Sequence, residues 1–321
     1  MEPEAMSRKE KPPLVFIVGP TGVGKTTLAI ETAQRFGTEI LTADSRQIYR
    51  LLDIGTAKPT PEEQTLVPHH LIDLIWPDQA FSVADYLRSF RVVQKDFLSS
   101  GKIPLVVGGT GLYIQAISRG LFKGPGANPE LRRELNTFAK KHGHKALHAC
   151  LERVDPEAAR RIHPHDLRRT IRALEVYLHT GHPISRLQQE ETSPEFSSPS
   201  LIFGLTRQRR ELYDRIEKRA ENMLKKGLVE EVRSLLSRGY AESLPALEAF
   251  GYRDIIAYLK GKQPLEEALR RLQRDSKRYA KRQLIWFSKE KDIQWFDLSE
   301  ISTEETLSAM AEEIARLGPT S

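Results

Sequence analysis

The sequence is poor in cysteine and contains no long hydrophobic run. Its 321 residues include one cysteine, Cys150, which can neither form a disulfide within the chain nor build a cysteine-based zinc site alone. The longest uninterrupted apolar runs, such as 14–18 and 105–107, are far shorter than the roughly 20 residues of a membrane-spanning helix. We therefore expect a cytoplasmic protein with no membrane partner.

The composition is that of an ordinary globular protein. Hydrophobic residues make up 39% of the chain and charged residues 29%, so the chain can bury a sizeable core. Its length corresponds to about two domains. Residues 1–13 (MEPEAMSRKEKPP) contain no apolar segment, so we see no secretory signal there and predict a disordered tail.

Strands and helices alternate along the first third of the chain. We predict strands at 14–18, 39–42, 103–107 and 200–205, with helices between them, which is typical of an α/β fold whose parallel sheet is flanked by helices. The strand pattern is absent from 120–200, where four helical segments occur. The sequence therefore predicts a core made of 14–119 and 201–321, interrupted by an inserted all-helical domain at 120–200.

A glycine-rich loop joins the first strand to the first helix. Its sequence GPTGVGKT fits the pattern G-x-x-x-x-G-K-[ST], in which backbone N–H groups and the lysine bind phosphate oxygens and the final hydroxyl can hold Mg²⁺. The pattern predicts a P-loop core that binds a diphosphate or triphosphate. The loop residues are Gly19, Pro20, Thr21, Gly22, Val23, Gly24, Lys25 and Thr26, the last being the expected magnesium ligand.

A carboxylate follows the second predicted strand. Asp44 lies where parallel strands end toward a ligand crevice, whereas the strand at 103–107 is followed by Gly-Gly-Thr and not by the aspartate common in phosphoryl-transfer enzymes. From spacing alone, Asp44 is either a catalytic base, the cap of a following turn, or a Mg²⁺ ligand.

Further motifs resemble the tRNA dimethylallyltransferase family, and the likeness extends in order over residues 14–296. They are ADSRQIYRLLDIGTAKPTPEE (43–63), VPHHLID (67–73), FSVAD (81–85), IPLVVGGTGLYIQA (103–116), RIHPHDLRRTIRALEV (161–176), the segment 214–227, FGYRD (250–254) and AKRQLIW (280–286). The resemblance implies transfer of the dimethylallyl group of dimethylallyl diphosphate to N6 of the adenosine 3′ of the anticodon, with release of diphosphate.

The resemblance also implies roles for individual residues. Asp44 corresponds to the general base that removes the N6 proton, and Arg219 and Thr26 act with the loop on the leaving diphosphate, whose charge grows in the transition state. The positions implied for tRNA binding are Asp44, Ser45, Arg46, Gln47, Thr110, Arg132, Arg168, Arg169, Thr170, Ile171, Arg172, Gly251, Tyr252 and Arg253. For Arg219 the alternative is a surface ion pair with Glu217 or Glu221.

A basic helix is predicted from helical geometry alone. Residues 270–282 contain seven basic residues and one acid, and at ~100° per residue the basic ones fall within an arc of about 140°. Like charges spaced four residues apart destabilise a helix, so an anionic partner such as RNA phosphate is expected. The arc includes Arg274, Arg278, Lys281 and Arg282; the alternative partners are Glu304, Glu305, Glu312 and Glu313.

Three rival functions remain. An adenylate isopentenyltransferase would use a free nucleotide as acceptor, a P-loop small-molecule kinase would transfer phosphate, and a non-catalytic RNA-binding protein would transfer nothing. We favour the tRNA reaction, with Mg²⁺ as cofactor, the tRNA anticodon arm and dimethylallyl diphosphate as partners, and a monomeric enzyme.

Overall fold

The computed structural model describes residues 13–122, 124–190 and 200–316. The predicted tail, apart from Pro13, and most of the polar segment 190–200 lie outside these residues. The chain divides into two compact units: unit 1 comprises 1–116 and 197–321, and unit 2 comprises 117–196. The inserted domain predicted from the sequence, 120–200, covers nearly the same residues as unit 2.

Unit 1 is built on a six-stranded sheet in the order β3-β2-β4-β1-β5-β6, in which every pairing is parallel. This confirms the predicted fold class. The central strands β1 and β4 are buried throughout, as expected where helices cover both faces. The strands are β1 (Leu14–Val18), β2 (Ile40–Ala43), β3 (His69–His70), β4 (Leu105–Gly108), β5 (Ser200–Thr206) and β6 (Ile293–Asp297).

The two edge strands were not predicted from the sequence. Strand β3 has only two residues, too few for an alternating pattern. Strand β6 carries exposed Gln294 and Trp295 between the buried residues Ile293 and Phe296, so its pattern is not that of a fully buried strand.

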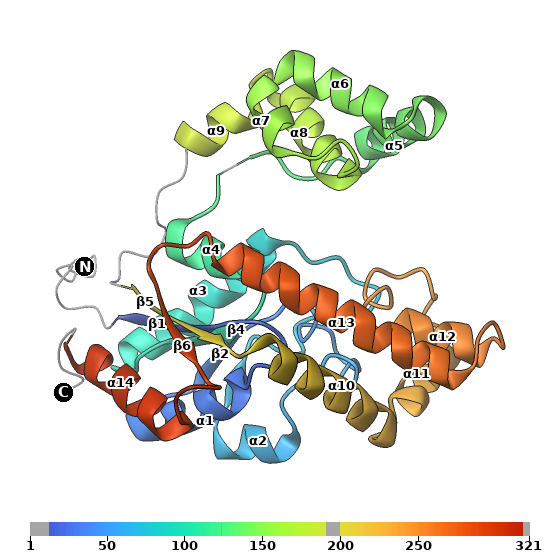
Figure 1. The fold of residues 1–321 in the computed structure, drawn as a ribbon. Coiled ribbons are helices and arrows are strands. Elements are labelled where there is room, and N and C mark those ends of the chain that lie inside the picture. The colour runs from blue at the N-terminus through green and yellow to red at the C-terminus, as the bar shows by residue number, and fades with distance from the viewer. Residues whose placement is uncertain (1–12, 123, 191–199, 317–321) are drawn as a thin grey trace. The chain divides into compact units, whose positions relative to one another are not determined.

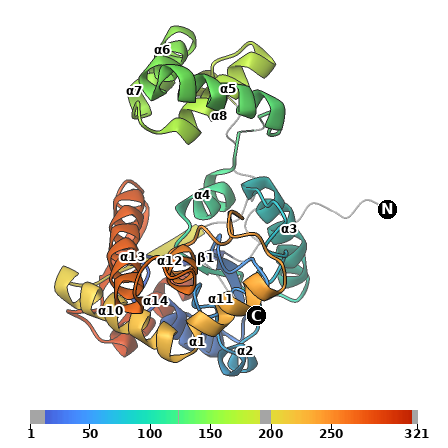
Figure 2. The same ribbon diagram turned by 90° about the vertical axis from the view of Figure 1, so that its right-hand side faces the viewer.

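Helices cover both faces of this sheet. Figure 1 shows α1 and α14 on one face and α3 and α4 on the other, and the Tyr86 hydroxyl of α3 donates to the Thr42 carbonyl of β2. A second group, α10 to α13, packs together beside the sheet (Figures 1 and 2) around buried Leu228, Tyr252 and Leu272. The helices are α1 (Lys25–Phe36), α2 (Pro61–Leu66), α3 (Val83–Ser99), α4 (Gly111–Arg119), α10 (Arg209–Lys225), α11 (Leu228–Ser237), α12 (Tyr252–Leu259), α13 (Leu265–Phe287) and α14 (Thr303–Arg316).

The secondary structure of the described residues of unit 2 consists of helices joined by short loops, and the unit has its own core. Leu147, Leu151 and Leu174 are at most 4% exposed within it. Its helices are α5 (Pro129–His142), α6 (His144–Val154), α7 (Pro156–Arg161), α8 (Leu167–Thr180) and α9 (Ile184–Glu190).

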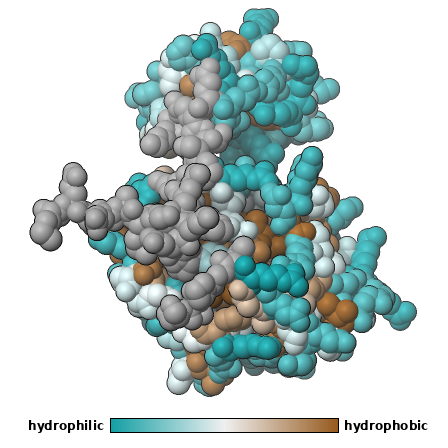
Figure 3. Space-filling model, turned by 90° about the vertical axis from the view of Figure 1, so that its left-hand side faces the viewer, coloured by the Kyte–Doolittle hydropathy of each residue, from teal (hydrophilic) through white to brown (hydrophobic). Residues whose placement is uncertain are grey.

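One face of the molecule is shown in Figure 3 with its side chains coloured by hydropathy. Hydrophilic side chains predominate on the face drawn in Figure 3, where hydrophobic side chains form small separate areas. In the described part of the chain, no helix is both long and apolar enough to span a bilayer.

Candidate active site

The phosphate loop lies between β1 and α1, as its sequence predicts. Gly24 precedes α1 with φ 115°, a conformation that side chains of L-residues rarely adopt. Because Gly24 has no side chain, it makes no capping hydrogen bond to the start of α1. The first N–H groups of α1 are therefore available to an anion.

The Lys25 ammonium lies inside the loop. Its Nζ donates to the carbonyls of Gly19 (3.0 Å) and Pro20 (2.8 Å). Burial, together with the positive charge of Arg219, lowers the pKa of Lys25 to about 7, although Asp44 acts in the opposite direction. An anion bound at the loop would replace these carbonyls and favour the charged amine.

Three arginines hold successive residues of the loop. Arg219 Nη1 donates to Thr21 Oγ1 (2.8 Å), Arg215 Nε donates to the Gly22 carbonyl (2.9 Å), and Arg207 Nε donates to the Val23 carbonyl (2.9 Å). Arg219 therefore faces the loop and not Glu217 or Glu221. Its pKa is lowered by burial, with Asp44 acting against that change.

Asp44 lies beside the phosphate loop. It directly follows β2, and its negative charge offsets part of the lowering of the pKa of Lys25 and of Arg219. One carboxylate oxygen, Oδ1, accepts the backbone N–H of Arg46 (2.8 Å). Asp44 thus makes the turn-capping contact considered above, while no described residue donates a hydrogen bond to its other oxygen.

The Gly-Gly-Thr turn after β4 brings Thr110 next to this carboxylate. Thr110 Oγ1 accepts the backbone N–H of Ser45 (3.0 Å), and the Thr110 N–H donates to the Ala43 carbonyl (3.2 Å). Three phenols are close enough to be affected. Burial and Asp44 raise the pKa of Tyr279 to about 12, and they raise the pKa of Tyr86 and of Tyr113 as well. The surroundings of Asp44 therefore include neutral hydroxyl groups.

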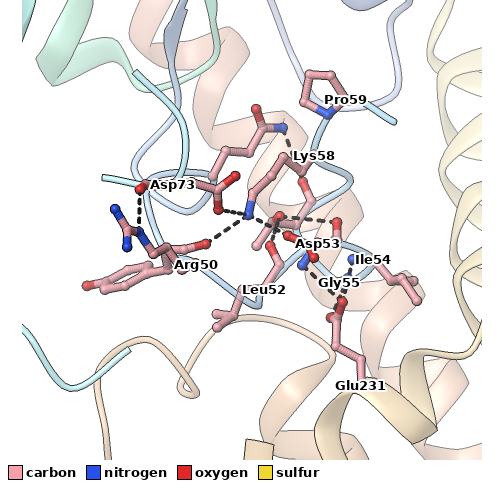
Figure 4. Close-up of polar contacts among 12 residues, drawn as sticks. Arg50, Leu52, Asp53, Ile54, Gly55, Lys58, Pro59, Asp73 and Glu231 are labelled. Atoms are coloured by element: carbon pink, nitrogen blue, oxygen red, sulfur yellow. Dashed lines mark hydrogen bonds and ion pairs between the residues drawn. The ribbon is translucent and has the colours of Figure 1, made fainter. Parts of the chain in front are cut away.

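The segment after Asp44 is held by two charged groups, shown in Figure 4. The nearly buried Lys58 ammonium donates to the Tyr49 carbonyl, to Asp53 and to Asp73. The Glu231 carboxylate from α11 accepts the N–H groups of three consecutive residues, 53–55, at 2.7–3.1 Å. These contacts fix a segment in which Leu51 and Ala57 both have positive φ, a strained conformation for residues other than glycine.

Other residues of the 45–47 segment also have partners. The exposed Arg46 donates from Nη1 to the Pro245 carbonyl (2.9 Å), and Gln47 Nε2 donates to the carbonyl of Ala57 (3.0 Å). Their side chains are therefore oriented within unit 1.

The basic face of α13 borders a groove of about 430 Å³ shared with α10. Asp275, 5% exposed, pairs with Arg253, Arg274 and Arg278. The acids of α14, the alternative partners, lie on a helix that packs against α1, and the described ion pairs of α13 go to Glu217, Glu267 and Asp275. The groove residues are Arg209, Tyr213, Glu217, Arg270, Gln273, Arg274, Lys277, Arg278 and Lys281.

The last predicted residues of this face are exposed as well. Lys281 has no described partner, and the Arg282 guanidinium lies over the rings of Phe250 (5.8 Å) and Tyr279 (5.7 Å). Gly251 has φ 89° at the start of α12.

In unit 2, two predicted RNA-binding arginines face an internal acid. Arg132 donates from Nε and Nη2 to the two oxygens of Glu175, both at 2.8 Å, and Arg172 donates to Glu175 Oε2 at 2.7 Å. These hydrogen bonds lower the pKa of Glu175, which is 1% exposed, to about 2 despite its burial. Arg168 and Arg169, by contrast, are exposed.

Three predicted RNA-binding residues are buried. Thr170 is 1% exposed, Ile171 5% and Tyr252 0%; the Tyr252 hydroxyl donates to Glu231 Oε1 (2.7 Å). Side chains without accessible surface cannot contact RNA in this conformation, because packing of α8 and α12 takes them inward.

Gln283 of α13 is a polar residue that sequence reasoning missed. It is 5% exposed; Oε1 accepts the Thr21 N–H (2.8 Å) and Nε2 donates to the Gly109 carbonyl (2.9 Å). Helical spacing could have indicated it, because Gln283 lies on the same face of the helix as the apolar residues Ala280 and Phe287, where a polar side chain needs hydrogen-bond partners. Arg215 was missed as well; it lies four residues before Arg219 on α10, so helical spacing places both arginines on the same face.

Magnesium ligands are few at the loop. Thr26 is exposed in the first turn of α1, as its motif requires, but the described residues contain no cluster of three or more His, Cys, Asp or Glu side chains suited to a metal. Thr26 therefore stays a predicted magnesium ligand.

Comparison with known proteins identifies the family to which the chain is similar. The IPP transferase family matches residues 47–290, and the isopentenyl transferase family matches residues 12–72. A tRNA dimethylallyltransferase from Thermotoga neapolitana is 44% identical over 94% of this chain and 98% of its own, and tRNA dimethylallyltransferase 2 from Syntrophus aciditrophicus is 48% identical over 90% and 93%.

Solved structures agree with these matches. The full-length tRNA isopentenylpyrophosphate transferase of Bacillus halodurans has a TM-score of 0.71 at 40% identity, covering 96% of this chain and 97% of its own. A eukaryotic dimethylallyltransferase acting on tRNA has a TM-score of 0.76 at 26% identity, covering 94% and 77%. The chain therefore belongs to the IPP transferase family, whose curated members at this similarity are tRNA dimethylallyltransferases.

Proposed function

We propose that this chain transfers the dimethylallyl group of dimethylallyl diphosphate to N6 of the adenosine 3′ of the anticodon in tRNA. The observation that carries the proposal is the position of Asp44. Its carboxylate has one oxygen that accepts no hydrogen bond from a described residue, and it lies next to the cations of a diphosphate-binding loop. This arrangement suits transfer of a carbon group from a diphosphate to an amine.

In the proposed reaction, the bond between C1 of the donor and the diphosphate oxygen breaks as the bond from N6 to C1 forms. The N6 proton passes to Asp44, a contribution of ~10²–10⁴-fold for general-base catalysis. The electron pair of the breaking bond leaves with the diphosphate. Lys25, Arg219 and the N–H groups at the start of α1 stabilise the charge that grows there.

The remaining residues bind the two substrates. Thr110 and Ser45 orient the acceptor base beside Asp44, and the exposed residues Arg46, Arg168 and Arg169 bind tRNA, as does the basic face of α13. Mg²⁺, held through Thr26 and the donor phosphates, would supply further neutralisation of the diphosphate charge. We propose that Arg132 and Arg172 shape the RNA-binding surface of unit 2 through Glu175. A monomeric state and a cytoplasmic location remain predictions.

The rival functions are less well supported. The relatives named above are tRNA dimethylallyltransferases, which does not favour a kinase or an adenylate isopentenyltransferase. A protein that only binds RNA would not require a carboxylate such as Asp44 beside a phosphate loop.

Transfer of label tests the function. Radiolabelled dimethylallyl diphosphate is incubated with the protein alone, with bulk tRNA, and with AMP, and labelled ATP is treated in the same way. Label passing from the prenyl donor into tRNA is expected. Label in AMP would support the adenylate isopentenyltransferase, and phosphate transfer from ATP would support the kinase; either result without tRNA labelling refutes the proposal.

The Asp44→Asn variant tests the base. The amide can keep the hydrogen bond from the Arg46 N–H but cannot take a proton, so kcat should fall by at least about 100-fold while pyrophosphate affinity remains within about threefold. Near-normal turnover would remove Asp44 from the mechanism.

A further inference from the structure

Helix α13 reaches two parts of the active site that are far apart in the sequence. Figure 1 shows it running from beside α4 to beside α12. Near its C-terminal end, Gln283 accepts the N–H of Thr21 in the phosphate loop and donates to the carbonyl of Gly109 in the turn after β4. These partners are 262 and 174 residues away in the chain.

The two contacts join the donor side of the site to the acceptor side. The Thr21 hydroxyl also accepts a hydrogen bond from the Arg219 guanidinium, and Gly109 precedes Thr110, whose hydroxyl accepts the Ser45 N–H. One amide side chain thus connects the loop proposed to hold the diphosphate with the turn after β4, and Thr110 of that turn contacts Ser45, the residue after Asp44.

The surrounding geometry holds this amide close to the turn. A Cβ on Gly109 would lie 2.1 Å from Gln283 Nε2, and a Cβ on Gly111 would lie 2.2 Å from the Trp286 ring. Glycine at both positions therefore allows α13 to approach the turn directly. Because Gln283 is 5% exposed, water cannot easily replace its two hydrogen bonds.

We propose that Gln283 is a positioning residue for the transfer reaction: its amide sets the distance between the diphosphate-binding loop and the acceptor turn. This inference rests on the proposed function and goes beyond it, because Gln283 touches neither reacting group. An error of about 1 Å in the placement of two reactants can reduce the rate by about 100-fold, so a tether at this position affects turnover more than binding.

The test uses the full chain with Gln283→Met, which keeps the side-chain length and removes both hydrogen bonds. Gln94→Met is the matched control, because Gln94 of α3 is equally buried, at 5% exposed, and lies outside the site. Gln283→Met should lower kcat by about 10- to 100-fold and change KM for dimethylallyl diphosphate and for tRNA by less than about threefold, while Gln94→Met should leave all three constants unchanged.

A second variant guards against misfolding of the first. Gly109→Ala leaves Gln283 in place but displaces its amide, so it should lower kcat in the same way. If both variants act through one contact, the double variant should be no slower than the slower single variant. Multiplying effects would overturn the proposal, as would unchanged kcat in Gln283→Met.

Hydrogen exchange tests whether the Gln283 side chain restrains the loop and the turn, and it does not depend on the transfer reaction. In Gln283→Met, the amides of residues 19, 21–25 and 108–111 should exchange faster together, whereas the same amides in Gln94→Met should exchange as in the unaltered protein. Failure of the unaltered chain to transfer label into tRNA refutes the proposed function, and the positioning role with it. Active unaltered protein with slow exchange in Gln283→Met refutes only the role of Gln283.

Discussion

The Glu231 carboxylate provides a quantitative test of how the segment after Asp44 is held. Glu231 accepts four hydrogen bonds: Oε2 from the N–H groups of Asp53 (3.0 Å) and Ile54 (2.7 Å), and Oε1 from Gly55 (3.1 Å) and the Tyr252 hydroxyl (2.7 Å). Glu231→Gln keeps the shape but replaces one accepting oxygen with an NH₂ group, which cannot accept.

The amide should turn its oxygen toward Gly55 and Tyr252. The contact that Asp53 loses is exposed and that of Ile54 is half-buried, so about one buried donor remains unsatisfied, at a cost of about 1–3 kcal/mol. For a unit of this size, each kcal/mol corresponds to a fall in Tm of about 2–4 °C. A fall of roughly 2–12 °C is therefore expected for Glu231→Gln.

Glu230→Gln is the matched control. Glu230 precedes Glu231 on α11, but its side chain is 67% exposed and pairs only with Arg233 (3.4 Å) among the described residues. Thermal unfolding of both variants should give a near-zero change for Glu230→Gln. Equal Tm values for the two variants would show that the carboxylate does not hold the segment.

Three further predictions concern charged residues. Arg219→Ala should weaken pyrophosphate binding and lower kcat at saturating donor, because Arg219 neutralises the leaving group; a change in tRNA affinity alone would assign the residue to the other substrate. Replacing Arg274 and Arg278 together by Gln should flatten the slope of log K for tRNA against log salt by about 1–2, because each phosphate contact contributes about 0.7–0.9 to that slope through the release of counterions. A slope equal to that of the unaltered protein would exclude both from the RNA interface. Hydrogen bonds from Arg132 and Arg172 lower the pKa of Glu175 to about 2, so its stabilising effect is present above about pH 4 and is lost as the pH falls toward 2. The difference in Tm between the unaltered protein and Glu175→Gln should therefore shrink between about pH 5 and about pH 2, and a constant difference would contradict this.

Local pattern in the sequence was sufficient for the phosphate loop and the class of fold. A buried strand, the GPTGVGKT turn and a following helix are contiguous, so the backbone geometry that binds phosphate is encoded within about a dozen residues. The position of Asp44 could be predicted for a similar reason, because carboxyl ends of parallel strands meet at one edge of the sheet.

Charge in the sequence did not determine which way each charged side chain faces. Arg132 and Arg172 looked like RNA-binding residues, yet both donate to the buried Glu175, which lies far along the chain from Arg132. Tyr252 likewise occurs in a motif beside a basic residue but is fully buried. Helical spacing predicts which residues share a face, but the packing of neighbouring elements decides whether that face meets water, an acid or the core.

The sequence by itself determined the parallel α/β core with its helical insertion, the phosphate loop, and a carboxylate at the end of the second strand. Only the tertiary structure decided that Arg207, Arg215 and Arg219 hold the loop and that Gln283 joins it to the acceptor turn. These contacts connect residues at least 174 positions apart, and a hydrogen bond between such distant groups leaves no periodic signal in either segment. It exists because the sheet and α13 bring the segments together when the chain folds.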